Sequence, residues 1–221
     1  MSTNPDEDRI YLDKPDTAFL TKAEITTWEA GKTFSTNWAA GHFFEWAELL
    51  HPLRQKVLRI LEIGSWEGRS ANFFLRYLPR SCVVCIDTFE GNVEHHRDSG
   101  FAKRVPESEG KFDRNLAELM DRVEKIKGTS ATVLPKLGVA RRRFDLAYID
   151  GSHMAADVDN DATLTWPMMQ PGGIVIFDDY EWGAEAEESE RPKLGIDAFL
   201  AAIGGHYQEL HRGFQLIIRK Y

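Results

Sequence analysis

From Val57 to the C-terminus, short apolar runs alternate with segments whose apolar residues recur at helical spacing. The run 144–150 has the length and composition of a buried strand, whereas segment 68–78 has the apolar spacing of an amphipathic helix. Alternation of this kind is typical of βαβ units, in which helices connect parallel strands. We therefore predict an α/β fold with a doubly wound, mainly parallel sheet.

The same pattern predicts the individual elements. We expect strands at residues 57–63, 82–87, 131–134, 144–150 and 173–178, and helices at residues 68–78, 112–126, 154–169 and 194–203. Residues 207–210 and 214–218 flank a glycine turn and predict a C-terminal antiparallel hairpin, giving a seven-stranded sheet. A chain of 221 residues suits one core. We predict a main domain at 51–221, preceded by a tail and helical extension at 1–50.

The net charge of −8 bears on which kinds of partner the protein can bind. An acidic surface argues against nucleic-acid binding, which needs clustered Lys and Arg side chains. The polar N-terminus contains no apolar signal-peptide core, and no later segment is long enough to span a bilayer. We expect a cytoplasmic protein that binds neither nucleic acid nor membrane.

Aromatic residues are interleaved along the helical segment 17–50. Two uses are open for them: they line the site of a small-molecule substrate, or they form the interface of a homo-oligomer. The long connections at 88–111 and 183–191 are lid candidates, with a plain solvated loop as the equal alternative for each.

Cys82 and Cys85 are the two cysteines of the chain, and their C-x-x-C spacing occurs in redox and zinc sites. Both fall within the strand predicted at 82–87, where residues three apart point to opposite faces. We therefore expect two buried core cysteines that form neither a disulfide nor a zinc site.

Acidic side chains recur at the points where the predicted strands end. Open α/β sheets bind their ligands at this carboxyl edge. The edge is expected to carry Glu62, Asp87, Asp150, Asp178 and Asp179. A phosphate-binding lysine is missing from these strand ends, so the pattern argues against a phosphate site.

The first strand continues into Glu62-x-Gly64-x-x-x-Gly68, where glycine lets the backbone turn sharply and approach a ligand closely. The spacing is neither the dinucleotide G-x-G-x-x-G nor a P-loop. Glu67, at the start of the next helix, disfavours a pyrophosphate and tolerates a sulfonium cofactor with net positive charge. Asp87 can accept from both ribose hydroxyls, a feature that NAD sites and adenosylmethionine sites share.

With these segments the sequence resembles the class I S-adenosylmethionine-dependent methyltransferases, which have a Rossmann-like fold. It is most similar to the branch that joins the catechol-type O-methyltransferases with the antibiotic and sugar O-methyltransferases. The resemblance runs from about Val57 to the C-terminus and is carried by four segments: Leu61–Gly64, Ile86-Asp87, Phe144–His153 (FDLAYIDGSH) and Gln170–Asp179 (QPGGIVIFDD). The pairing of I-D-G-S-H with P-G-G-x-x-x-x-D-D is its most specific part.

The resemblance implies roles for individual residues. In the family the adenosylmethionine tail lies over the first glycine loop, the acid after the second strand binds the ribose, and the loop after the third strand holds the adenine. The cofactor-binding residues implied here are Glu62, Gly64, Ser65, Gly68, Ser70, Asp87, Gly128, Thr129, Ser130 and Asp150.

Many members of this branch also bind a divalent metal through acids after strands four and five. Those positions correspond to Asp150, Asp178 and Asp179. The chemistry of the residues agrees, because three converging carboxylates repel one another and Mg²⁺ prefers carboxylate and water oxygens. The alternative is that Asp178 or Asp179 merely caps the following turn.

His153 and Asp150 are the candidate catalytic residues. The catechol-type enzymes carry a basic lysine where this chain has His153, so the chain departs from the pattern but retains a group suited to proton abstraction near neutral pH. The alternative is that His153 caps the following helix or orients Asp150.

These observations predict an S-adenosylmethionine-dependent O-methyltransferase that acts on a small-molecule hydroxyl with the help of Mg²⁺. The acceptor hydroxyl belongs to a catechol, a sugar or another natural product. Three alternatives stay open: a metal-independent methyltransferase that uses His153 as base, an NAD(P)-dependent oxidoreductase, and a non-catalytic scaffold of the same fold.

Overall fold

A computed structural model describes residues 14–92 and 99–221. Part of the predicted N-terminal extension and part of the 88–111 lid candidate lie outside these residues. The chain forms two compact units. The sheet unit comprises Leu58–Gly64, Cys82–Thr88 and Glu124–Tyr221, and the helical unit comprises the chain up to Val57, Ser65–Ser81 and Phe89–Val123.

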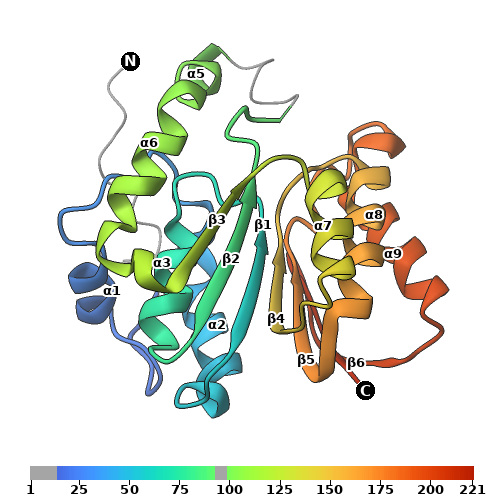
Figure 1. Ribbon diagram of the computed structural model, residues 1–221, viewed down its shortest axis with the longest axis horizontal. Helices are drawn as coiled ribbons and strands as arrows, with labels where there is room; N and C mark the ends of the chain where they lie inside the picture. Colours follow the sequence, from blue (N-terminus) through green and yellow to red (C-terminus); the bar gives the residue numbers. More distant parts are fainter. Residues whose placement is uncertain (1–13, 93–98) are drawn as a thin grey trace. The chain divides into compact units, whose positions relative to one another are not determined.

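Seven strands form one sheet in the order β3-β2-β1-β4-β5-β7-β6 (Figure 1). Their bounds are β1 Arg59–Ile63, β2 Cys82–Asp87, β3 Val123–Lys127, β4 Phe144–Ile149, β5 Met169–Phe177, β6 Tyr207–Arg212 and β7 Leu216–Lys220. β1 pairs in parallel with β2 and β4, and β4 pairs in parallel with β5. β7 runs antiparallel to both β5 and β6. The predicted mainly parallel sheet with a closing antiparallel hairpin is confirmed.

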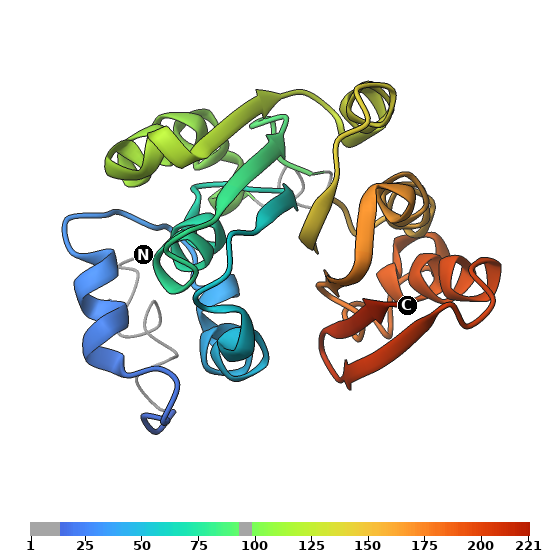
Figure 2. The same cartoon turned by 60° about the horizontal axis from the view of Figure 1, so that its bottom comes forward.

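Three helices belong to the sheet unit: α7 (Ser130–Val139), α8 (Ala155–Thr165) and α9 (Pro192–Ala202). They lie beside one another along the C-terminal part of the sheet (Figures 1 and 2). Leu134, Val158 and Ile196, one from each helix, are buried in one cluster with Val175 and Phe177 of β5. Burial of these apolar side chains holds the strands whose ends carry the acids.

The helical unit has its own core. Its helices are α1 (Lys22–Glu29), α2 (Phe43–Leu50), α3 (Arg69–Tyr77), α5 (Ser99–Ala102) and α6 (Val105–Asn115), with short 3₁₀ segments between them. Phe43 and Trp46 of α2 pack on Phe73 of α3 at ring-centroid distances of 4.4 and 5.5 Å. Several aromatics of segment 17–50 therefore form internal packing. No helix among the described residues has the length and apolarity needed to cross a membrane.

Two predicted elements are wrong. The helix expected at 112–126 is replaced by the end of α6, a 3₁₀ turn over Ala117–Arg122 and strand β3. The strand expected at 131–134 lies inside α7. β3 is an edge strand whose side chains are only partly buried, so charged residues interrupt the apolar pattern by which a strand is recognised.

The two cysteines differ in burial. Cys85 is buried, as predicted, but Cys82 is exposed, because it is the first residue of β2. Both are free thiols, so the expectation that they form no disulfide agrees with the structure.

The close packing of α8 and α9 gives a test of the fold. A methyl group on Gly195 would lie 2.0 Å from the carbonyl oxygen of Ala155, and backbone cannot move aside cheaply. We expect Gly195→Ala to cost about 3 kcal/mol and to lower the melting temperature by roughly 6–12 °C in a calorimetric scan.

Gly138→Ala in α7 is the matched control, because a methyl group there meets no heavy atom within 4 Å among the described residues. It is expected to stabilise the helix by about 0.5–1 kcal/mol. Equal melting temperatures for the two variants would contradict the packing described for α8 and α9.

Candidate active site

Backbone hydrogen bonds join the strand ends of the sheet unit in order. Gly64 N–H donates to the Ile86 carbonyl at 2.9 Å, and Gly128 N–H donates to the Asp87 carbonyl at 2.9 Å. On the other side of β1, Asp150 N–H donates to the Ile63 carbonyl at 2.8 Å, and Asp178 N–H donates to the Ile149 carbonyl at 3.0 Å. These bonds bring the predicted residues Glu62, Gly64, Asp87, Gly128, Asp150 and Asp178 to one edge of the sheet.

Gly64 is required by this arrangement. Its φ is +85°, and a Cβ at this position would lie 1.9 Å from the carbonyl oxygen of Asp150. A side chain would therefore push apart the loops that follow β1 and β4. The absence of a side chain at Gly64 therefore allows the close approach of the Asp150 backbone.

Ser65, Gly68 and Ser70 continue the glycine loop into the helical unit. Gly68 has φ +79° and precedes the first residue of α3, while Ser65 and Ser70 are buried. Thr129 and Ser130 begin α7 in the sheet unit. Trp66, between the glycines, also has a left-handed backbone, with φ +46°. Such strain in a residue other than glycine is common at functional loops.

Glu67 is a buried carboxylate that is hydrogen-bonded and ion-paired within the helical unit, a role that was not predicted from the sequence. It is 1% exposed, and its carboxylate accepts from the Ser35 N–H and hydroxyl at 2.5 Å and from Lys111 Nζ at 2.9 Å. Its charge is thus balanced inside the helical unit. Because Lys111 balances its charge, Glu67 gives no support to the predicted preference against a pyrophosphate.

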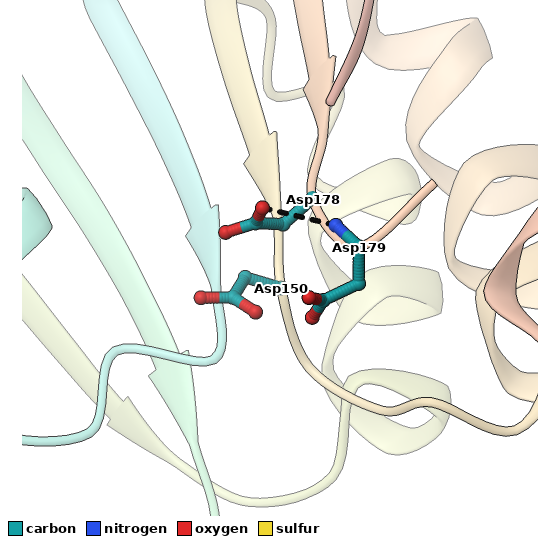
Figure 3. A group of neighbouring side chains, drawn as sticks. All are labelled: Asp150, Asp178 and Asp179. Atoms are coloured by element: carbon teal, nitrogen blue, oxygen red, sulfur yellow. Dashed lines mark hydrogen bonds between the residues drawn. The ribbon is translucent and has the colours of Figure 1, made fainter. Parts of the chain in front are cut away.

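Three carboxylates converge where β4 and β5 end. One oxygen from each of Asp150, Asp178 and Asp179 lies within 4.8 Å of the others (Figure 3). Asp179 has φ +56°, and its N–H donates to Asp178 Oδ1 at 2.9 Å. The left-handed turn lets two consecutive residues contribute to one cluster.

The cluster is electrostatically unfavourable as it stands. Removal from water, followed by the charges of Asp178 and Asp179, raises the pKa of Asp150 well above its usual range. Glu62, buried on β1, raises it further. Like charges that are held together in low polarity favour the binding of a proton or a cation.

His153 lies at this cluster and contacts Asp179. Its Nε2 lies 2.8 Å from Asp179 Oδ2, and its ring centroid lies 4.1 Å from that of Trp182. It precedes α8 by two residues. The contact with Asp179 adds to the two readings given for His153 from the sequence, a general base or a residue that caps the helix or orients Asp150.

Two further side chains contact the cluster and were not predicted from the sequence. Tyr148 lies within β4, and its hydroxyl donates to Asp150 Oδ2 at 2.9 Å and also to Asp178 Oδ2. Gln215 Nε2 donates to Asp178 Oδ1 at 3.0 Å. A polar residue inside an apolar strand was the available signal for Tyr148.

Residues 61–180 match the family described as "Methyltransferase domain". The chain belongs to this methyltransferase family. The match contains the glycine loop and all three acids of the cluster, so the predicted class I methyltransferase is confirmed.

Two of the relatives that match this chain in sequence are O-methyltransferases. Mycinamicin VI 2''-O-methyltransferase from Micromonospora griseorubida is 27% identical over 133 residues, which are 57% of this chain and 28% of that protein. The chain thus spans less than a third of the length of this relative. The similarity to antibiotic O-methyltransferases expected from the sequence is confirmed.

Solved structures support the fold. An O-methyltransferase from Bacillus cereus in complex with S-adenosylhomocysteine has a TM-score of 0.62 and 18% identity, covering 96% of this chain and 95% of that one. The MycE methyltransferase of mycinamycin biosynthesis, in complex with Mg, S-adenosylhomocysteine and mycinamycin VI, has a TM-score of 0.57 and 17% identity. This match covers 89% of the present chain and 54% of the MycE chain.

Asp161 of α8 is a buried carboxylate beneath the loop after β4. It is 2% exposed, it is hydrogen-bonded to Ser130, and its Oδ1 lacks a hydrogen-bond partner among the described residues. A methyl group on Gly151 would stand 3.4 Å from Asp161 Oδ2. Burial raises the pKa of Asp161 to about 7, against a smaller lowering by Ser130.

This pKa predicts a pH-dependent stability. Because the folded-state pKa is raised above the unfolded value, the protonated carboxyl favours folding, and this contribution is lost as pH rises through about 7. Asp161→Asn mimics the neutral form. We expect Asp161→Asn to increase the free energy of unfolding, measured in urea. This increase should be about 2 kcal/mol larger at pH 8 than at pH 5.

Asp121→Asn is the control, because Asp121 is an exposed carboxylate of the 3₁₀ turn over Ala117–Arg122 and is not among the charges that act on Asp161. Its effect on the free energy of unfolding should be similar at both pH values. An Asp161→Asn effect that is equal at pH 5 and pH 8 would show that the carboxyl is not held protonated by burial.

Proposed function

We propose that this chain is an S-adenosylmethionine-dependent O-methyltransferase that acts on a small-molecule hydroxyl with the assistance of Mg²⁺. The observation that carries the proposal is the convergence of Asp150, Asp178 and Asp179 within 4.8 Å at the ends of β4 and β5. The family match favours methyl transfer over the oxidoreductase alternative.

The cluster suits a hard divalent cation. Its donors are carboxylate oxygens, the ligands that Mg²⁺ prefers. Burial, and after it the charges of Asp178 and Asp179, raises the pKa of Asp150, which supports a site that favours a bound cation. A bound cation would stabilise the ionised cluster and lower the pKa of an acceptor hydroxyl. The Mg that accompanies S-adenosylhomocysteine in the MycE complex supports the same assignment.

The methyl donor is proposed to lie along the strand ends from β1 to β3. Asp87, at the end of β2, is the residue we propose to accept from the ribose hydroxyls. Its carbonyl oxygen accepts from the N–H of Gly128, which begins the proposed adenine loop. Glu62, Gly64, Ser65, Gly68 and Ser70 follow the chain through the loop proposed for the methionine tail, while Thr129 and Ser130 follow Gly128. The sulfonium supplies an activated methyl group, so the chain has to position the acceptor and remove its proton.

His153 is the proton acceptor that we propose. Asp179 Oδ2 holds its Nε2 at 2.8 Å, an arrangement in which a carboxylate orients an imidazole and stabilises its protonated form. Asp150 instead accepts from Tyr148 and contributes to the cation site. Trp182 packs its ring on His153 and limits the movement of the imidazole.

Cofactor binding and turnover can be tested separately. We expect the protein to bind S-adenosylhomocysteine and not NAD⁺ in titration calorimetry. With S-adenosylmethionine and Mg²⁺ it should release S-adenosylhomocysteine in the presence of a hydroxyl acceptor from a panel of catechols and glycosides. Binding of NAD⁺ alone would contradict the proposal.

The variant Asp150→Ala tests the cation site. It removes one proposed ligand oxygen and one of the two acids that accept from Tyr148, so turnover should fall by more than the roughly 10–100-fold that outer-shell substitutions cost. The Kd for S-adenosylhomocysteine should change by less than about tenfold. Treatment of the wild type with EDTA should abolish turnover, and added Mg²⁺ should restore it. Turnover that survives both changes would favour the metal-independent alternative.

The variant His153→Gln tests the proton acceptor. General-base catalysis contributes about 10²–10⁴-fold, so the turnover number should fall within that range while the affinity for Mg²⁺ changes little. His206→Gln is the control, because His206 is an exposed histidine that precedes β6. A normal turnover number in His153→Gln would restrict His153 to an orienting role.

A further inference from the structure

Three donors of the chain surround Asp178. Its Oδ1 accepts from Gln215 Nε2 at 3.0 Å and from the Asp179 N–H at 2.9 Å, while its Oδ2 accepts from the Tyr148 hydroxyl. A carboxylate oxygen has two lone pairs, so these two bonds use the capacity of Oδ1. We therefore assign Oδ2 as the Asp178 oxygen that faces the cation.

Tyr148 joins two of the acids through one atom. The side chain is fully buried within β4, and its hydroxyl lies 2.9 Å from Asp150 Oδ2 as well as within hydrogen-bond distance of Asp178 Oδ2. A single hydroxyl thus draws together the carboxylates that follow two neighbouring strands. This contact opposes the repulsion between them.

Gln215 approaches from the C-terminal hairpin. It immediately precedes β7, is 1% exposed, and lies beside Asp178 because Leu216 pairs with Phe177 in the antiparallel ladder. A buried amide donor at this position has a clear partner in the Asp178 carboxylate.

We infer that the Tyr148 hydroxyl and the Gln215 amide form a clamp that holds Asp150 and Asp178 in one arrangement and thereby sets the affinity of the site for a divalent cation. Both are positioning residues, since they act through the carboxylates. The inference rests on the proposed function. Its physical basis is that Mg²⁺ demands near-ideal octahedral geometry, which carboxylates that are free to swing apart do not provide.

The decisive measurement is a titration of Mn²⁺ into the metal-free full chain. Tyr148→Phe keeps the ring and removes only the hydroxyl, and we expect it to weaken Mn²⁺ binding by about 10–100-fold. Gln215→Leu should weaken it in the same direction. Excess Mn²⁺ should restore turnover in both variants, because the defect lies in cation affinity and not in the reacting groups.

Tyr77→Phe is the matched control. Tyr77 is a fully buried tyrosine of the helical unit whose hydroxyl donates to the Ala47 carbonyl at 2.7 Å. Its loss should lower the melting temperature and leave the Kd for Mn²⁺ unchanged. Equal Mn²⁺ affinity in Tyr148→Phe and the wild type would overturn the inference while leaving the proposed function intact.

The clamp also has a test that needs no cation. In EDTA, Tyr148→Phe should lower the melting temperature by about 5 °C in the wild type. The shift should be clearly smaller in an Asp178→Asn background, where one of the repelling charges is gone. Equal shifts in both backgrounds would overturn the clamp. Failure of the wild type to bind Mn²⁺ would instead overturn the cation part of the proposed function.

Discussion

The parallel pairing of β4 with β1 and β5 is the constraint on which the site depends. Ile149 pairs with both Ile63 and Phe177, so the residue after each of these strands emerges at the same edge. Asp150 and Asp178 follow β4 and β5 directly, and the fold cannot keep their carboxylates apart. Burial at this edge, together with the charges of Asp178 and Asp179, raises the pKa of Asp150. In the proposed function, a bound cation relieves the repulsion between these carboxylates.

The parts of the fold that could be predicted are those in which the sequence pattern is local. β1, β2, β4 and β5 are apolar runs, and each ends next to a glycine or an acid. Because parallel strands end at one edge, reading the ends of the runs was enough to place Asp150, Asp178 and Asp179 together. The 4.8 Å grouping of their oxygens confirms that placement.

Elements and contacts that depend on distant parts of the chain could not be predicted. β3 lies at the sheet edge, where partial exposure permits the charged residues of Val123–Lys127, and the helical spacing of Leu116, Leu119 and Val123 concealed the change of element. Asp178, which accepts from both Tyr148 and Gln215, lies 30 residues from the first and 37 residues from the second. Side-chain contacts of this kind follow from register, which a single sequence does not display.

The antiparallel direction of β7 has an electrostatic consequence. In a purely parallel sheet, the side chains at the carboxyl edge come from strand ends, and in this chain those ends carry acids. β7 runs the other way and begins beside the end of β5, so the residue before it reaches the same edge from the opposite direction. That residue is Gln215, a neutral amide that donates to Asp178. The hairpin therefore supplies a hydrogen-bond donor where the parallel strands supply negative charge, and this donor restrains the Asp178 carboxylate within the cluster.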